Sequence, residues 1–111
     1  MFKHSKQGAI NVISGTLPLS GDALELLEGA FDGCLSEGQP RAVLDLRSVP
    51  LIDSAGLERL LDLRDRFQKK MGDLKLAGAN PLCDDILSVT GVASYFDVFP
   101  ELSQAVGSFI E

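Results

Sequence analysis

Leu51-Ile52-Asp53-Ser54-Ala55-Gly56-Leu57 joins two segments of different hydrophobic period. The segment before it, Ala42-Val43-Leu44-Asp45-Leu46, is short and apolar, which is typical of a strand covered on both faces. After Gly56, apolar residues recur at helical spacing: Leu57, Leu60, Leu61, Phe67 and Met71. The pattern therefore predicts a strand, a short connection, and a helix from Ser54 to about Met71, with Ser54 as a preferred N-cap residue.

Ser54 is the residue in this segment to which chemistry can be assigned. Unpaired N–H groups and the positive end of the helix dipole favour an anion at a helix N-terminus. Two interpretations follow: a helix-capping serine, or a phosphorylatable serine on a surface that faces a partner. A phosphate on Ser54 would be met by the amides of Ala55, Gly56 and Leu57, so the fold is expected to survive phosphorylation.

The rest of the chain alternates strand and helix patterns with short connections. Strands are predicted over residues 9–17 and 74–76, and a short extended segment over 95–99. The remaining helices are predicted to begin near residues 20–22, at Asn80-Pro81 and at Pro100. Residues 1–6, with the single histidine His4, are expected to form a mobile arm. This alternation predicts an α/β fold with a largely parallel sheet.

Composition excludes several classes of function. The chain has 16 acidic against 10 basic residues, a net charge of −6, and no basic run, which argues against nucleic-acid binding. No apolar run approaches the roughly 20 residues that span a membrane, and no signal peptide is recognisable, so a cytoplasmic protein is expected. Cys34 and Cys83 are predicted to be small core residues. One histidine and two separated cysteines match no zinc spacing, so neither a metal nor a cofactor is expected.

Asp45 is a second candidate phosphoacceptor, because its strand superficially resembles that of a response-regulator receiver domain. A receiver would also need an acidic pair after its first strand and a lysine on a later strand. Ser14-Gly15-Thr16 and Leu76-Ala77-Gly78-Ala79 stand at those places instead. We therefore predict that Asp45 is a structural carboxylate that bonds loop backbone near Ser54.

One stretch of this chain closely resembles the signature of STAS domains, in particular that of the small bacterial anti-sigma-factor antagonists. The stretch consists of Asp53-Ser54-Ala55-Gly56-Leu57 together with residues 43–52 before it. Matches to the family continue in order over residues 74–81, 86–92 and 99–106. The resemblance implies one STAS domain over residues 1–111, α/β in class, with a mixed, mostly parallel sheet of four or five strands and interspersed helices. One departure concerns the partner-facing surface, where Gly15-Thr16-Leu17-Pro18 lacks an acid that many members carry.

The function implied by this resemblance is partner switching. A serine protein kinase that is itself an anti-sigma factor would bind the unphosphorylated chain and phosphorylate Ser54, and a PP2C-type phosphatase would reverse the modification. The implied partner-binding residues are Asp53, Ser54, Ala55, Gly56 and Leu57. The chain would then be a binding module and a kinase substrate rather than an enzyme. Two alternatives stay open: an unphosphorylated STAS subunit of a transporter or lipid-trafficking complex, and a nucleotide-binding sensor.

Overall fold

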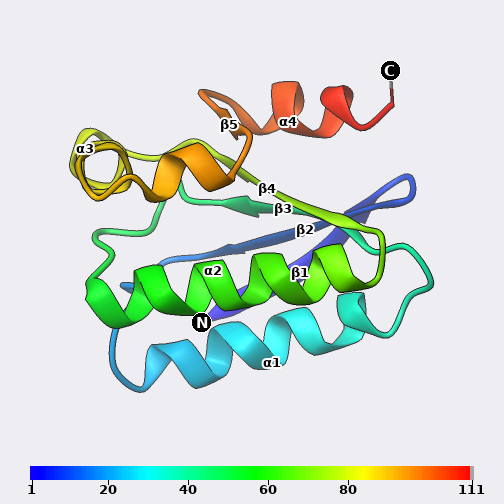
Figure 1. The fold of residues 1–111 in the computed structure, drawn as a ribbon, viewed down its shortest axis with the longest axis horizontal. Coiled ribbons are helices and arrows are strands. Elements are labelled where there is room, and N and C mark those ends of the chain that lie inside the picture. The colour runs from blue at the N-terminus through cyan, green and yellow to red at the C-terminus, as the bar shows by residue number, and fades with distance from the viewer. Residues whose placement is uncertain (111) are drawn as a thin grey trace.

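The computed structural model describes residues 1–110 and contains a five-stranded mixed sheet with helices packed on both faces (Figure 1). The strands lie across the sheet in chain order: β1 (Phe2–Gln7), β2 (Ile10–Gly15), β3 (Arg41–Asp45), β4 (Asp73–Ala77) and β5 (Val98–Phe99). β1 and β2 form an antiparallel hairpin, and the other neighbouring pairs are parallel. The predicted α/β class and mostly parallel sheet are confirmed.

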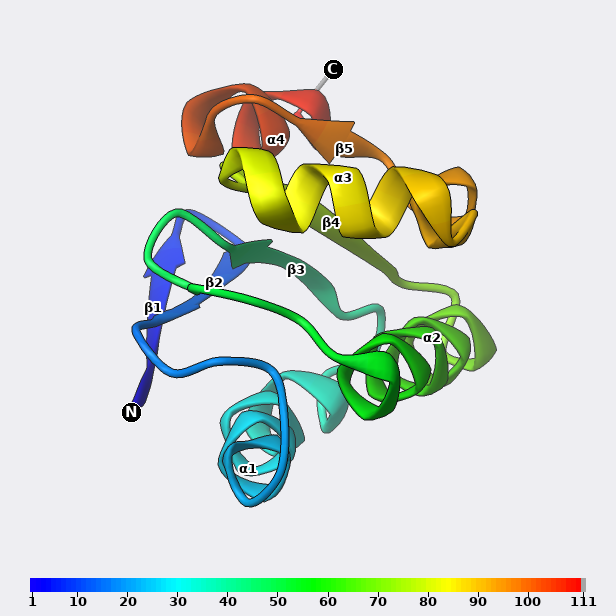
Figure 2. The same cartoon turned by 90° about the vertical axis from the view of Figure 1, so that its left-hand side faces the viewer.

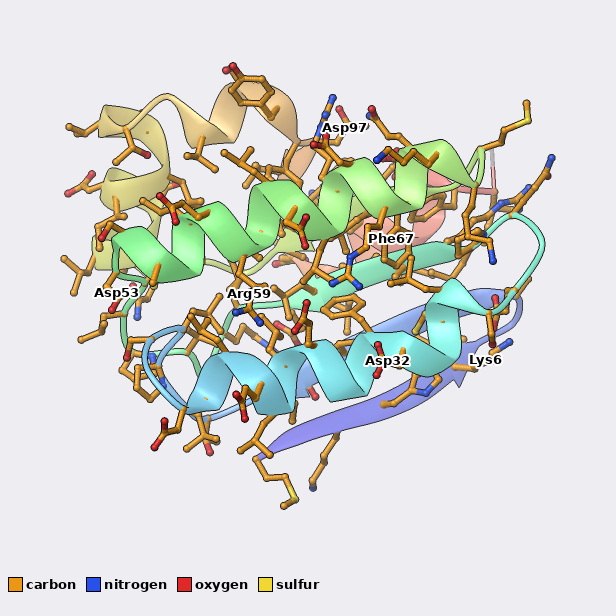
Figure 3. All side chains as sticks on the ribbon, turned by 60° about the horizontal axis from the view of Figure 1, so that its bottom comes forward. Lys6, Asp32, Asp53, Arg59, Phe67 and Asp97 are labelled. Carbon is orange, nitrogen blue, oxygen red and sulfur yellow. The ribbon has the colours of Figure 1, made fainter. Side chains whose placement is uncertain are left out.

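Within residues 1–110, four helices and one 3-10 turn complete the fold: α1 (Ala23–Leu35), α2 (Ser54–Lys69), α3 (Pro81–Val89), η1 (Val92–Tyr95) and α4 (Leu102–Ser108). α1 and α2 lie side by side on one face of the sheet, and α4 lies on the other (Figure 2). Glu28 of α1 joins the two neighbouring helices, because it accepts from Arg59 at 2.8 Å and from Arg66 at 2.6 Å (Figure 3 shows Arg59 between the helices). None of the helices described in residues 1–110 combines the length and the apolar character that crossing a bilayer requires.

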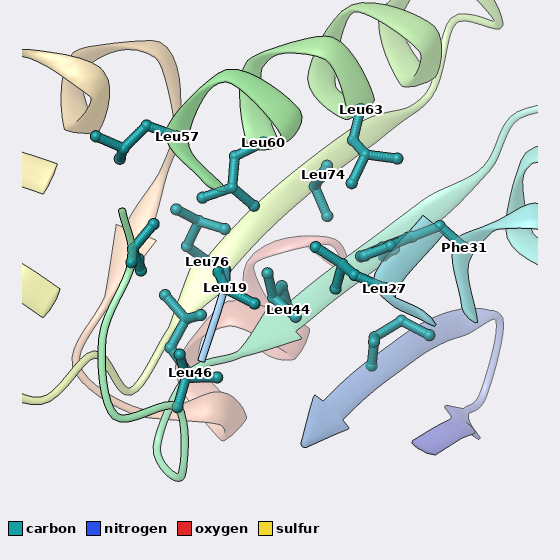
Figure 4. Close-up of a cluster of buried hydrophobic side chains, with 14 of the residues drawn as sticks. Leu19, Leu27, Phe31, Leu44, Leu46, Leu57, Leu60, Leu63, Leu74 and Leu76 are labelled. Carbon is teal, nitrogen blue, oxygen red and sulfur yellow. The ribbon is translucent and has the colours of Figure 1, made fainter. Parts of the chain in front are cut away.

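The central strands are buried on both faces, as the apolar run around Val43 predicts. Ala42, Leu44 and Leu46 point into the main core beneath α1 and α2, whereas Val43 points into a smaller core beneath α4. Leucines from the sheet and from α2 fill the main core (Figure 4). Phe31 and Phe67 meet edge-on there, with ring centroids 5.8 Å apart. This packing determines how α2, and with it Ser54, sits on the sheet.

The predicted mobile arm at the N-terminus is wrong, because residues 2–7 form the edge strand β1. The ladder to β2 runs from Phe2↔Gly15 to Gln7↔Ile10, and Gly8 at φ +63° allows the tight turn between them. Only Phe2 of the strand is buried, so the alternating apolar pattern that reveals a strand is missing. The pairing with β2, rather than the composition of the segment, orders these residues.

Both cysteines lie in the core, as predicted. Cys34 and Cys83 are fully buried and are not joined in a disulfide. Burial raises the pKa of the Cys34 thiol to about 11 and also raises the pKa of Cys83. Both thiols are therefore protonated, and weak nucleophiles, at neutral pH.

Candidate partner-binding surface at the start of α2

The loop that leads into α2 is held by a second loop that follows β2. Leu19 donates its N–H to the Leu51 carbonyl at 2.9 Å and accepts from the Asp53 N–H at 3.2 Å. Leu19 and Ile52 form an isolated parallel bridge, and both side chains are buried. The two loops lie at the same edge of the sheet, where β2 and β3 end. These main-chain bonds place the first residue of α2 independently of its own side chain.

Asp53, and not Ser54, is the N-cap of α2 (Figure 3 labels Asp53 at the start of the helix). Its backbone is extended, at φ −95° and ψ −177°, and its Oδ1 accepts from the Gly56 N–H at 2.9 Å. Ser54 is the first helical residue. The prediction that Ser54 caps the helix is therefore wrong. Asp and Ser are about equally good caps, and side-chain spacing locates a helix start only to within one or two residues.

The Ser54 side chain is consequently left without a structural role in the cap. Ser54 is exposed, and its hydroxyl makes no hydrogen bond to any residue in the described range 1–110. Of the two interpretations that the sequence leaves open, the capping serine is excluded. An exposed hydroxyl with free lone pairs and a free proton is accessible to a kinase active site.

Fewer backbone N–H groups are free at the start of α2 than the sequence predicts. The Gly56 N–H bonds the Asp53 carboxylate, and the Leu57 N–H bonds the Asp53 carbonyl at 2.9 Å. Among the described residues, only the N–H groups of Ser54 and Ala55 stay without partners in the first turn. The expected phosphate cradle of Ala55, Gly56 and Leu57 is therefore reduced to the amides of Ser54 and Ala55.

The five residues predicted to bind a partner divide into two groups. Asp53, Ser54 and Ala55 are exposed, whereas Gly56 is buried and Leu57 is only 9% exposed. A Cβ on Gly56 would lie 2.1 Å from the Leu19 carbonyl oxygen and 3.0 Å from Ile52 Cγ2. Gly56 therefore allows α2 to touch the neighbouring loop, and Leu57 anchors the helix in the core. These two residues position the exposed three.

The loop before α2 and the start of α3 each expose a leucine side chain. Leu51 is 39% exposed, and Leu82, at the start of α3, is 53% exposed. Asn80 ties α3 to the loop before α2, because its Nδ2 donates to the Val49 carbonyl at 3.0 Å. Its Oδ1 also caps α3 by accepting from the Cys83 N–H at 2.7 Å. The cap was predictable from Asn80-Pro81, but the bond to another loop had no signal in the local sequence.

Asp45 has the structural role that was predicted for it, since it bonds loop backbone. It is 4% exposed, and its Oδ1 accepts from the Arg47 N–H at 3.1 Å. Its Oδ2 accepts from the Arg47 guanidinium at 3.1 and 3.3 Å. The guanidinium contact is an addition that the sequence did not suggest. Both carboxylate oxygens are thus bonded, which accounts for the burial of this charge.

Replacing the cap should cost more stability than replacing the serine. Asp53→Ala is expected to lower the free energy of unfolding by about 1 kcal/mol, because the Gly56 N–H loses its acceptor. Ser54→Ala should change it by less than about 0.5 kcal/mol, as for other exposed side chains. Urea unfolding of the two variants and the wild type measures both values. An equal loss in the two variants would contradict the assignment of Asp53 as the cap.

Comparison with known proteins matches most of this chain to a family model. The family model for the STAS domain matches residues 5–105. BtrV of Bordetella bronchiseptica, a candidate anti-sigma factor antagonist, is 29% identical over 85 residues, which are 77% of this chain and 73% of BtrV.

Solved structures share the fold at lower identity. A candidate anti-sigma factor antagonist of Thermotoga maritima, TM1081, is 20% identical, with a TM-score of 0.90 over 99% of this chain and 95% of that one. The anti-sigma factor antagonist SpoIIAA in its unphosphorylated form is 14% identical, with a TM-score of 0.78 over 98% and 96%. The fold also recurs within the murine anion transporter Slc26a9, at 20% identity and a TM-score of 0.77, over 88% of this chain and 17% of the transporter.

Proposed function

This chain belongs to the STAS domain family, and from that membership we propose that it is a cytoplasmic anti-sigma-factor antagonist that acts by partner switching. In the proposed cycle the unphosphorylated chain binds a serine protein kinase that is itself an anti-sigma factor, and so frees a sigma factor. Phosphorylation of Ser54 releases the kinase, and a PP2C-type phosphatase resets the chain. The chain itself is a binding module and a phosphorylation substrate, not an enzyme.

The observation that carries this proposal is the free Ser54 hydroxyl. Asp53 supplies the cap, so Ser54 is exposed without a hydrogen bond to the described part of the chain. A serine at this place is expected to be replaceable without loss of folding, yet the strand, loop and helix around it present it on the surface. The similarity to BtrV, a candidate anti-sigma factor antagonist, supports the same assignment.

The charges around Ser54 explain how a phosphate would act as a switch. A phosphoserine carries about −1.5 to −2 charges at neutral pH. The exposed acids Asp53 and Glu58 lie in the same part of the chain, and neither forms an ion pair with a described residue. A partner that fits this acidic surface would meet a bulky added dianion in its interface. Like-charge contact and desolvation at an interface cost several kcal/mol, so the complex would dissociate.

No large conformational change is needed for this switch. The start of α2 is held by the Leu19 main-chain bonds and by the Asp53 cap, and none of these involves the Ser54 hydroxyl. The free amides of Ser54 and Ala55 would bond part of the phosphate, while the Asp53 carboxylate would repel it. The phosphate is therefore expected to project outward, toward the partner.

Phosphopeptide mass spectrometry on the protein isolated from its native cells tests the proposal, with a Ser54→Ala chain as the control. The proposal expects phosphate on the peptide that contains Ser54, in at least one growth or stress condition, and none on the control peptide. Absence of phosphate from Ser54 in every condition would contradict it. That result would favour an unphosphorylated STAS subunit of a larger complex, in which the same surface is a permanent interface.

A further inference from the structure

A polar hollow lies at the edge of the sheet where β1 begins and where β2 and β3 end. Its volume is about 340 Å³, and its polar lining residues are Lys3, Ser14, Thr16, Asp45, Arg47 and Ser48. Lys3 of β1 lies opposite Ser14 of β2 in the antiparallel hairpin, so the edge strand supplies one wall. The loop after β3 supplies the other. The hollow exists only because residues 2–7 are ordered as a strand.

Two cationic side chains line this hollow. Lys3 is exposed and forms no ion pair within residues 1–110. The Arg47 guanidinium is held in place by Asp45, which binds its Nε and Nη2 and leaves Nη1 without a partner among the described residues. The Arg47 side chain is 70% exposed although one edge of it is anchored. A guanidinium oriented in this way presents further N–H donors in a defined direction.

Hydroxyl groups add neutral donors to the same hollow. The side chains of Ser14, Thr16 and Ser48 make no hydrogen bond to any residue that the structure describes. Lys3 and Arg47 carry two positive charges and Asp45 one negative charge, which leaves one net positive charge in a chain of net charge −6. Both Asp45 oxygens accept from Arg47, and this pairing offsets part of the carboxylate charge that a bound anion would face.

These groups match a ligand that accepts hydrogen bonds at several oxygens and carries negative charge. A phosphate group has both properties, and arginine and lysine are the side chains that bind it most often. No aromatic side chain lines the hollow within the described chain, so there is no surface on which a nucleobase would stack. The volume is at the lower end of the range for small-molecule sites.

We propose that this hollow binds the phosphate group of a small phosphate monoester, with Arg47 and Lys3 as its charged ligands and the three hydroxyls as further donors. The same chemistry would accept either a free monoester or a phosphorylated side chain of another protein. The proposal does not depend on Ser54 being phosphorylated, since none of these residues takes part in the α2 cap.

The test is an NMR titration of the ¹⁵N-labelled chain with sodium phosphate, against sodium chloride at equal ionic strength. Saturable shifts are expected at the amides of Gly15, Arg47 and Ser48. The dissociation constant should rise by about tenfold or more in Lys3→Ala and in Arg47→Ala, as expected when a charged ligand to an anion is removed. Lys3→Ala leaves the Asp45–Arg47 pair intact, so its effect is not explained by a disturbed loop.

Arg41→Ala is the matched control. Arg41 is also exposed and forms no ion pair in the described range, but it lies at the opposite end of β3 from Arg47. The control should bind phosphate as the wild type does. Shifts that rise without saturation, or that persist in the Lys3→Ala and Arg47→Ala variants, would overturn the proposal. Further titrations with glycerol phosphate and with a phosphoserine tripeptide then compare a free monoester with a protein-borne phosphate. The compound that binds more tightly identifies the kind of ligand.

Discussion

Ser54→Asp is expected to weaken binding of the proposed anti-sigma kinase by about a hundredfold or more, while the chain stays folded. The new carboxylate adds a negative charge beside Asp53, on a surface that the proposed complex covers. Like-charge and desolvation penalties of several kcal/mol are typical of such contacts, and each ~1.4 kcal/mol is tenfold in affinity. Stability should change little, because Asp53 keeps its bond to the Gly56 N–H and an added acid in the first turn suits the helix dipole.

Isothermal titration of the kinase with wild type, Ser54→Asp and Ser103→Asp measures this effect. Ser103 is the matched control, since it too is exposed and lies in the first turn of a helix, α4. α4 covers the face of the sheet opposite α1 and α2. Ser103→Asp should bind as tightly as the wild type. The switch mechanism is refuted if Ser54→Asp binds the kinase with wild-type affinity.

Gly56→Ala is expected to lower the free energy of unfolding by about 2–4 kcal/mol, the largest loss of any single methyl addition near the site. The added Cβ would lie 2.1 Å from the Leu19 carbonyl oxygen, far inside contact distance. Either α2 or the loop must move, and movement of the loop breaks the bond from the Asp53 N–H to the same carbonyl. The variant should therefore also lose kinase binding, but through misplacement of Ser54.

Gly29→Ala provides the control for this substitution. Gly29 lies inside α1, and a Cβ there would meet nothing within 4 Å. The same change should stabilise the chain there by about 0.5–1 kcal/mol, since alanine favours helix over glycine. Urea unfolding of the two variants gives the difference directly. A Gly56→Ala variant as stable as Gly29→Ala would show that the contact with Leu19 is not close in solution.

Kinase binding and stability together separate the two roles within residues 53–57. Loss of affinity at unchanged stability, as expected for Ser54→Asp, identifies a residue that faces the partner. Loss of both, as expected for Gly56→Ala, identifies a residue that positions the others. The burial of Gly56 and Leu57 and the exposure of Ser54 and Ala55 predict which result each of these positions gives. Asp53 is exposed but caps α2, so its replacement should lower both affinity and stability.

Much of this architecture is predictable from local patterns. The apolar run around Val43 predicted a strand covered on both faces, and the helical spacing from Leu57 to Phe67 predicted α2. Asn80-Pro81 predicted the start of α3, which Asn80 caps, and Gly91, at φ +80°, follows its last turn. Each signal involves residues within a few positions of one another, so the chain carries it in any fold.

The features that the sequence does not reveal depend on residues that are distant in the chain. Polar residues 3–7 carry no strand pattern, and they form β1 because β2 offers a free edge. Leu19 sets where α2 begins, so Asp53 rather than Ser54 becomes the cap, although either residue suits that position locally. Gly56 is needed because a carbonyl from another loop lies against it, and the hollow of Lys3 and Arg47 forms only when three strand ends meet. Periodicity and capping preference are properties of neighbouring residues, whereas these contacts arise from long-range pairing and packing, which is why they become visible only in the folded chain.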